Sequence, residues 1–554
     1  MRLISVCLTL ILVLVAPLHT AQARQAAISS AHPAATDAGF EILEQGGNAF
    51  DAAVAVSAVL AVVEPYSSGI GGGGFWLLYR NKDGKQIMID GREKAPYQSH
   101  RDMYLDSTGE VIPGLSVDGP LSAGIPGEPA ALVHIAEKYG KLSLHKTLAP
   151  AIRAARNGFK VTPHYQRMAQ FRLEALRKSP AAAKIFLLNN EVPPLGYVIK
   201  QEDLAKTLEA MAKHGRAGFY EGEVARRLVT ETRKAGGIWS MQDLAKYQIV
   251  ERKPLTGHYR GYQITSAAPP SSGGIALLEI LHQLEGLDLH EQNNLQRKHL
   301  IIEAMRRAYR DRAEYLGDPD FVKVPIKTLL SKQHADQLRK SIDPEWATPS
   351  SDLKPVASKD SGFHTTHFSI IDKHGNRVAA TLSINYPFGS CYVPPGTGVL
   401  LNDEMDDFSA KPGVPNAYGL VGAEANAIAP GKRMLSSMSP TFVENKQRLA
   451  VIGTPGGSRI ITMVLHGILA FVDGKDAETI VNLPRYHHQY LPDMVQHEVD
   501  AFSAEEKAGL EKRGHQLKQL DSTYGNMHIV IQDKKTGKLS AAGDKRGEGK
   551  ALVK

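Results

Sequence analysis

The 554-residue chain carries a net charge of +7 and is 43% hydrophobic, which is typical of a globular protein with a large core. Its lysines and arginines are spread along the sequence without a basic cluster interleaved with aromatic residues, so we expect no nucleic-acid partner. The only cysteines are Cys7 and Cys391, which excludes a framework of disulfides and a cysteine-based metal site.

The first 23 residues (1–23) have the pattern of a secretory signal peptide. A largely apolar run over residues 3–15 is followed by Ala21-Gln22-Ala23, an A-x-A cleavage site. The run is shorter than the ~20 residues that a membrane-spanning helix needs, and Cys7 within it has no small-residue lipobox before it. We therefore expect a protein exported to the periplasm or secreted to the medium, with no membrane anchor after signal removal.

Two helices and a glycine-rich loop are predicted next. Residues 32–45 have apolar positions at helical spacing, and Asn48 can cap a helix over 49–63. The second helix is apolar on nearly every side, which is typical of a buried helix. The glycine-rich stretch 67–74 lacks the G-x-x-x-x-G-K-[ST] pattern of a phosphate-binding loop, so we expect no nucleotide there.

Strands are predicted over residues 75–79 and 86–90, and Arg92 lies just past the second one. Functional residues gather on loops that a rigid scaffold holds in place, which makes Arg92 a candidate. From residue 126 to about 330 the pattern is mainly helical, with a strand-like segment at 259–265. The expected helices cover residues 129–139, 144–157, 203–214, 221–235, 274–283 and 297–315.

The composition changes sharply before residue 365. Residues 341–362 are rich in Pro, Ser, Asp and Lys with almost no apolar periodicity, which is typical of a flexible linker. Residues 365–371 then alternate as a strand, and 377–384 return as a second strand after a turn. This hairpin would bring Ser383 beside Thr365.

A cut before Thr365 would turn this residue into an N-terminal nucleophile. Inside a chain, a threonine hydroxyl stays protonated near neutral pH and needs a base. A free α-amine, with a pKa near ~7.7, can be that base. A flexible segment upstream of a buried strand is the arrangement that a self-cleaving precursor needs. Spacing alone does not exclude Thr366 as the nucleophile.

The C-terminal part is predicted to add a second block of strands. A hairpin over residues 440–443 and 449–452 leads to the loop 453–458 and to a buried helix over 460–472. Further strands are expected near 527–532 and 539–542. Two blocks of strands with buried helices outside them indicate stacked sheets between helix layers.

Six stretches of the chain match, in order, the motifs of one known family. They are residues 67–75, 90–96, 365–372, 400–408 (LLNDEMDDF), 432–440 (KRMLSSMSP) and 453–461 (GTPGGSRII). On these motifs the chain resembles the γ-glutamyltransferases (glutathione hydrolases) of the N-terminal-nucleophile hydrolase superfamily, over essentially its whole mature length. The resemblance implies an α+β fold, a four-layer αββα sandwich formed jointly by two chains cut from one precursor. The large subunit would be 24–364, with a flexible pro-segment at about 341–364, and the small catalytic subunit 365–554.

The resemblance also implies roles for individual residues. Thr365 would make the cut after His364 and then be the catalytic nucleophile. A γ-glutamyl substrate ends in an amino acid zwitterion, so the site must hold a carboxylate and an ammonium together, and a guanidinium can grip both carboxylate oxygens. The implied site residues are Arg92, Ser436 and Ser437 for the carboxylate, Asp407 with Glu404 and Asn385 for the ammonium, Ser383 near the Thr365 amine, and the backbone N–H groups of Gly456 and Gly457 as the oxyanion hole.

The implied reaction moves the γ-glutamyl group of glutathione or a related compound onto Thr365 as an ester, then to water or to an amino acid or dipeptide. The resemblance implies no cofactor. His364 and His367 form an H-x-x-H, but no third ligand is evident and we expect no metal there. Residues 412–422 resemble a lid loop that some members fold over the pocket, with Tyr418 as its gate.

The sequence departs from the family pattern at three positions. Ser383 replaces the usual threonine, Asp403 stands where asparagine is more frequent and adds a negative charge, and His364 is at a variable position.

Two other functions stay open. A cephalosporin acylase of the same superfamily removes a glutaryl group, which lacks the ammonium that Asp407 would pair with. A non-catalytic protein that binds γ-glutamyl compounds would need neither Thr365 nor the oxyanion glycines.

Overall fold

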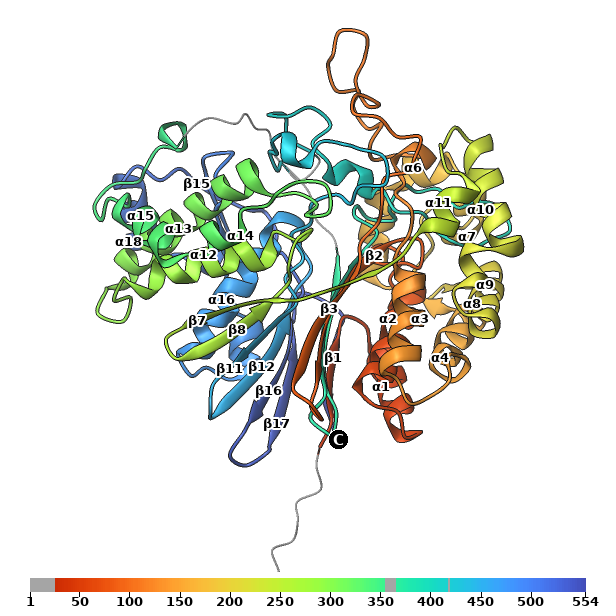
Figure 1. The fold of residues 1–554 in the computed structure, drawn as a ribbon, viewed down its shortest axis with the longest axis horizontal. Helices are drawn as coiled ribbons and strands as arrows, with labels where there is room; N and C mark the ends of the chain where they lie inside the picture. Colours follow the sequence, from red (N-terminus) through yellow and green to blue (C-terminus); the bar gives the residue numbers. More distant parts are fainter. Residues whose placement is uncertain (1–24, 354–364, 417–418) are drawn as a thin grey trace, which may run out of the picture.

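Two large β-sheets lie face to face in the middle of the molecule, and helices cover the outer face of each (Figure 1). The computed structural model describes residues 25–353, 365–416 and 419–554. The predicted α+β class and the αββα order of layers are confirmed.

Within the described residues, one central sheet has seven strands and the other has six. The first runs, in spatial order, β18 (Lys550–Val553), β1 (Ala27–Ser30), β9 (Thr366–Ile371), β10 (Arg377–Ser383), β2 (Gly73–Arg80), β3 (Lys85–Gly91) and β6 (Val250–Arg252). The second runs β17 (Leu539–Gly543), β16 (His528–Asp533), β12 (Arg448–Gly453), β11 (Thr441–Glu444), β8 (Tyr262–Ser266) and β7 (Leu255–Tyr259). Each sheet therefore combines strands that precede Thr365 with strands that follow it.

Alternation along the strands divides the core between the layers. On β2, Trp76 and Leu78 pack into the core shared with the first helix layer, whereas Phe75 and Leu77 pack into the core shared with the six-stranded sheet. The two sheets are also joined by a hydrogen bond, since Ser369 Oγ of β9 donates to the carbonyl of His528 on β16 at 3.2 Å. The middle of β9 is thus tied to the six-stranded sheet as well as to its neighbours in its own sheet.

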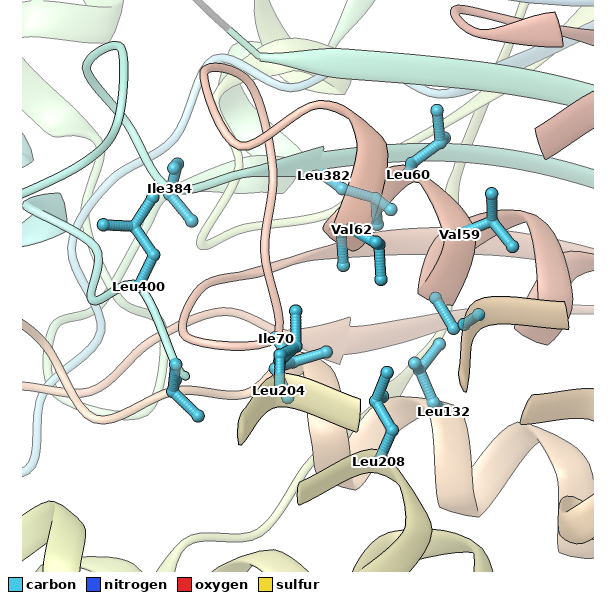
Figure 2. Packing of buried hydrophobic residues seen from close by; sticks show 14 of the residues in the cluster. Val59, Leu60, Val62, Ile70, Leu132, Leu204, Leu208, Leu382, Ile384 and Leu400 are labelled. Carbon is cyan, nitrogen blue, oxygen red and sulfur yellow. The ribbon is translucent and has the colours of Figure 1, made fainter. Parts of the chain in front are cut away.

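The first helix layer packs on the seven-stranded sheet. The buried helix expected after Asn48 is α2, all of whose residues are buried, and Asn48 and Asp51 form a capping box at its start. Figure 2 shows Val59, Leu60 and Val62 of α2 with Leu382 of β10 beside them, and Leu132, Leu204 and Leu208 from two further helices. The main helices of this layer are α1 (Pro33–Glu44), α2 (Ala49–Val63), α3 (Glu128–Tyr139), α4 (Leu144–Asn157), α8 (Glu202–His214) and α10 (Gly222–Lys234).

The second helix layer packs on the six-stranded sheet. Its central helix, α16, has all but its last residue buried, as its apolar sequence predicts. The helices of this layer are α12 (Gly273–Glu285), α13 (Asn294–Tyr315), α14 (Ile326–Leu329), α15 (Lys332–Lys340), α16 (Ile460–Val472), α17 (Ala477–Val481) and α18 (Ala504–Lys512).

Several elements differ from the sequence prediction. The single strand expected over 259–265 is a hairpin: β7 ends at Tyr259, and Arg260 and Gly261, both with positive φ, turn the chain into β8. The edge-region strands β1 and β18 were not predicted. The other elements that were not predicted are β4 (Phe159–Lys160), β5 (Val198–Ile199), β6, β13 (Tyr486–His487), β14 (Val495–His497), β15 (Leu517–Gln519), α5 (Pro163–Phe171), α6 (Leu173–Arg177), α7 (Pro180–Phe186), α9 (Ala217–Tyr220), α11 (Met241–Lys246), α14, α15, α17 and α18.

The segment expected to be flexible is held in place over its first part. Ser350 is buried, its backbone N–H donates to Asp493 at 2.7 Å, and Arg306 of α13 donates to its hydroxyl at 2.6 Å. Arg307 similarly donates to the carbonyl of Ser341 at 2.6 Å. Residues 341–353 therefore lie on the second helix layer, and residues 354–364 are outside the described part of the chain.

Candidate active site

Thr365 precedes β9 and faces two neighbouring cavities. It is 6% exposed. Because Leu382 of β10 pairs with Thr366, the next residue, Ser383, stands at the position opposite Thr365, as the predicted hairpin requires. One cavity is a small recess on the Arg92 side, and the other is a larger space lined by Glu64 and Thr366.

The recess brings together nearly all of the predicted site residues. Segments far apart in the sequence supply them: the end of β3, the end of β10, the loop 402–408, the turn 434–438 and the loop after β12. The predicted residues that line the recess are Thr365, Arg92, Ser383, Asn385, Glu404, Asp407, Ser436, Ser437 and Gly457. Gly456, the remaining one, lines the larger cavity, which Thr365 also borders.

Arg92 is fully buried, and its guanidinium contacts two acids of the recess. Its Nη1 donates to Glu404 Oε2 at 2.5 Å and its Nη2 donates to the Asp407 carboxylate. Its Nε and Nη2 also donate to the carbonyls of Met434 and Leu435, each at 3.3 Å. Burial alone would lower the pKa of Arg92, but the nearby carboxylates hold it above its usual value. A substrate carboxylate can reach this guanidinium only by displacing one of its present partners.

The acids around Arg92 differ in their tendency to ionise. Burial raises the pKa of Glu404 to about 7, against the opposing effect of Arg92. Burial, followed by the charge of Glu404, raises the pKa of Glu93 well above its usual value. Asp407 is the most accessible of the three, with 14% of its side chain exposed. It is therefore the acid best placed to meet a ligand.

Asp403, the residue expected to add a negative charge near the site, does not itself line the recess. It is fully buried away from the recess lining, and its Oδ1 accepts a hydrogen bond from the backbone N–H of Tyr386 at 2.9 Å. Burial raises the pKa of Asp403 well above its usual value, which favours the neutral acid.

Short polar contacts fix the remaining side chains of the recess. The backbone N–H of Asn385 donates to Ser383 Oγ at 2.7 Å, and Asn385 Nδ2 donates to the carbonyl of Asp403 at 3.0 Å. Arg312, a residue that the sequence analysis missed, is buried on α13 and its Nη2 donates to Ser437 Oγ at 3.2 Å. Its position inside an ordinary helical pattern gave no signal. Arg312 therefore adds a second guanidinium behind Ser437.

The two predicted oxyanion-hole glycines form the turn between β12 and α16. Gly456 has φ of 141° and Gly457 has φ of 55°, conformations that L-residues rarely adopt. A Cβ on Gly456 would lie 2.5 Å from the Met463 methyl group. Glycine at position 456 therefore avoids both a strained backbone and a clash with Met463.

Thr365 and Thr366 both line the larger cavity, which has a volume of about 440 Å³, but their surroundings differ. Thr366 is completely buried in β9, and its hydroxyl donates to Glu64 Oε2 at 2.7 Å. Only Thr365 of the two threonines lines the Arg92 recess. The geometry therefore favours Thr365 over Thr366 as the nucleophile.

The raised pKa of the buried Glu64 carboxyl can be tested by the pH dependence of the protein's stability. Burial raises its pKa from 4.5 to about 7, so the folded protein holds this proton more tightly than the unfolded chain. The resulting stabilisation is complete below pH 4.5 and is lost as the pH rises through about 7. Glu64→Gln stays neutral. We expect it to raise the free energy of unfolding by up to about 3 kcal/mol near pH 8, with the gain shrinking toward pH 4.5.

Calorimetric melting of wild type and Glu64→Gln at both pH values checks this expectation. Glu174→Gln, at an exposed surface position, is the control and should change the melting temperature little at either pH. If Glu64→Gln melted at the same temperature as the wild type near pH 8, or at a lower one, the raised pKa of Glu64 would be contradicted.

The loop resembling a lid lies against the recess. Leu420 lines the recess, and Asn416 Nδ2 donates to Asp407 Oδ1 at 3.3 Å. The expected gate, Tyr418, and the residue before the cut, His364, are outside the described residues. The contacts of Asn416 and Leu420 place this loop next to the acid that would receive the substrate ammonium.

The fold and the residues around Thr365 define a class, the N-terminal-nucleophile hydrolases. The family model "Gamma-glutamyltranspeptidase" matches residues 35–554. The "Glutathione hydrolase proenzyme" of Escherichia coli (strain K12) is 42% identical over 535 residues, covering 95% of this chain and 91% of that protein. The chain belongs to the γ-glutamyltranspeptidase family.

Solved structures agree with this placement. The γ-glutamyltranspeptidase of Helicobacter pylori is 42% identical with a TM-score of 0.57, covering 59% of this chain and 94% of its own. A cephalosporin acylase from Bacillus halodurans superposes with a TM-score of 0.84 at 28% identity, covering 96% of each chain. Overall shape therefore does not separate the two substrate classes, and the choice between them depends on the recess.

Proposed function

We propose that this chain is the precursor of a self-processing γ-glutamyltransferase that cleaves the γ-glutamyl amide bond of glutathione and related compounds. The observation that carries the proposal is the ion pair between Arg92 and Asp407 in the recess that Thr365 borders. Membership of the γ-glutamyltranspeptidase family supports it.

The opposite charges of Arg92 and Asp407 are complementary to those of a zwitterion. A γ-glutamyl group carries an α-carboxylate and an α-ammonium on one carbon, so it can insert between the two side chains. The carboxylate then takes the place of Asp407 at Arg92, and the ammonium gives Asp407 a new partner. Glu404 supports the ammonium, and Ser436 and Ser437, backed by Arg312, support the carboxylate. No charge is left unpaired, which is the condition for burying charged groups at low cost.

The chemistry then falls to Thr365. Its Oγ attacks the γ-carbonyl carbon while its own α-amine takes the hydroxyl proton and delivers it to the leaving amine. The backbone N–H groups of Gly456 and Gly457 stabilise the oxyanion of the tetrahedral intermediate. Collapse leaves a γ-glutamyl ester on Thr365, which water or the amine of an amino acid or dipeptide resolves.

We further propose that the mature enzyme consists of residues 24–364 and 365–554. The Helicobacter pylori chain aligns to a share of this sequence close to that of 24–364, which supports separate subunits. In the seven-stranded sheet β1 lies between β18 and β9, and β2 pairs with β10, so strands of the two parts are hydrogen-bonded to each other and the cut chains stay joined. Removal of residues 1–23 and export to the periplasm or medium complete the proposal. No helix in the described part of the chain is long and apolar enough to span a membrane.

The oxyanion hole can be tested at Gly456. Gly456→Ala strains a backbone with φ of 141° and brings its Cβ against Met463, which moves the N–H groups off their target. We expect kcat for a γ-glutamyl anilide to fall by about 10²-fold, with a smaller change in KM. Gly474→Ala is the matched control, since Gly474 also has positive φ but lies at the exposed end of α16. Equal kcat values for Gly456→Ala and wild type would contradict the assigned role.

A further inference from the structure

Three ionisable side chains that the proposed reaction does not use meet in the second helix layer. Glu279 comes from α12, Asp311 from α13 and His334 from α15. One potential ligand atom from each lies within 4.8 Å of the other two. His334 Nε2 is 2.6 Å from Asp311 Oδ2 and 3.6 Å from Glu279 Oε1.

Glu279 is the residue that needs an explanation. It is 1% exposed, and neither carboxyl oxygen has a hydrogen-bond partner among the described residues. Its Oε1 is directed at His334, but at 3.6 Å the contact is longer than a hydrogen bond. An unsatisfied buried carboxyl is costly, and an unaccounted ion is one of the standard reasons for such a group.

The spacing of the three ligand atoms suits a small divalent ion. Zinc bonds to nitrogen and oxygen ligands measure about 2.0–2.2 Å, so the ligand atoms of a tetrahedral site lie roughly 3.3–3.6 Å apart. The observed separations of 2.6 and 3.6 Å bracket this range. Two carboxylates also balance the charge of a divalent ion. The one cation that competes among the described residues is Arg310, whose Nη2 is 3.0 Å from Asp311 Oδ1 and whose side chain is partly exposed.

We propose that Glu279, Asp311 and His334 bind a divalent transition-metal ion of the zinc type, with water as a further ligand. One imidazole and two carboxylates are a ligand set that such ions accept. The ion would join α12, α13 and α15 within the second helix layer. Its role is structural, because none of its ligands lines the recess or the larger cavity at Thr365.

Zinc binding to the full protein tests the proposal. After dialysis against a chelator, isothermal titration with zinc chloride should show one site per chain, and zinc should raise the melting temperature. Glu279→Gln is nearly isosteric, so it should fold and lose this one equivalent, and His334→Ala should lose it too. His290→Ala is the matched control, since His290 is half exposed and lies 3.5 Å from a carboxylate of Asp473. It should retain the site.

A measurement on the wild type avoids any folding defect of the variants. Anomalous diffraction at the zinc edge from a zinc-soaked crystal should show a peak between Glu279, Asp311 and His334. Absence of that peak, or equal zinc stoichiometry in wild type and Glu279→Gln, would overturn the proposal. His334 would then be paired with the two carboxyl groups, and no metal would be bound.

Discussion

Replacing Thr365 by alanine is expected to give a single uncut chain with no measurable turnover of a γ-glutamyl anilide. In the proposed mechanism the Thr365 hydroxyl is the nucleophile for both the cut and the transfer, so one substitution removes both steps. We expect kcat/KM to fall by about 10⁴-fold or more, as when the nucleophile of a related acyl-transfer enzyme is removed. Denaturing electrophoresis and an anilide assay on the same preparation give the two readouts.

Thr366→Ala is the matched control for this experiment. Thr366 is the neighbouring threonine and belongs to β9. Its hydroxyl donates to Glu64, at the end of α2, and it does not line the recess. We expect this variant to be cut before residue 365 and to keep activity. Thr365→Ser keeps a hydroxyl and should retain partial cutting. A Thr365→Ala protein that is cut and active would refute the role of Thr365.

The second large effect is expected at Asp407. Asp407→Asn keeps the shape of the side chain but removes the charge that would pair with the substrate ammonium. Loss of one member of a buried, hydrogen-bonded charge pair costs about 2–5 kcal/mol, which corresponds to a fall in kcat/KM of roughly 30- to 5000-fold. The effect should come mainly through KM, measured with a γ-glutamyl anilide.

A glutaryl anilide makes this test specific. Glutaryl has the carboxylate but no α-ammonium, so in the wild type it would displace Asp407 from Arg92 and leave the acid unpaired. Asp407→Asn should therefore narrow the preference for γ-glutamyl over glutaryl. Asp406→Asn is a control, because Asp406 does not line the recess and accepts from Ser116 at 2.6 Å. If the wild type cleaved the glutaryl anilide faster than the γ-glutamyl anilide, the result would favour an acylase, the class of the similar Bacillus halodurans protein.

Much of the fold could be predicted because its signals are local. The all-apolar pattern of α2 and α16 and the hairpin of β9 and β10 follow from periodicity and turn residues alone. The strands β1 and β18 could not be found this way. Each has only four residues, and each is a strand because it pairs with a partner far away in the chain.

In the candidate site, too, the features with a local sequence signal could be predicted, and the contacts between distant residues could not. Motifs located Arg92, Asp407 and the glycine pair, because each lies in a short and unusual stretch of sequence. They did not show that Arg92 and Asp407 contact one another, since their distance in sequence carries no such information. Arg312 was missed because an arginine on a helix is ordinarily a surface residue, and only the packing of α13 buries it behind Ser437.

The proposed function requires that the chain cuts itself and exposes Thr365 as an N-terminal nucleophile. Intact mass spectrometry of the purified wild-type protein, with N-terminal sequencing of every chain, tests it most directly. We expect two chains held together in the native protein, one of them beginning at Thr365. A single chain that stays uncut through long incubation, or a new chain that begins at Thr366, would contradict it.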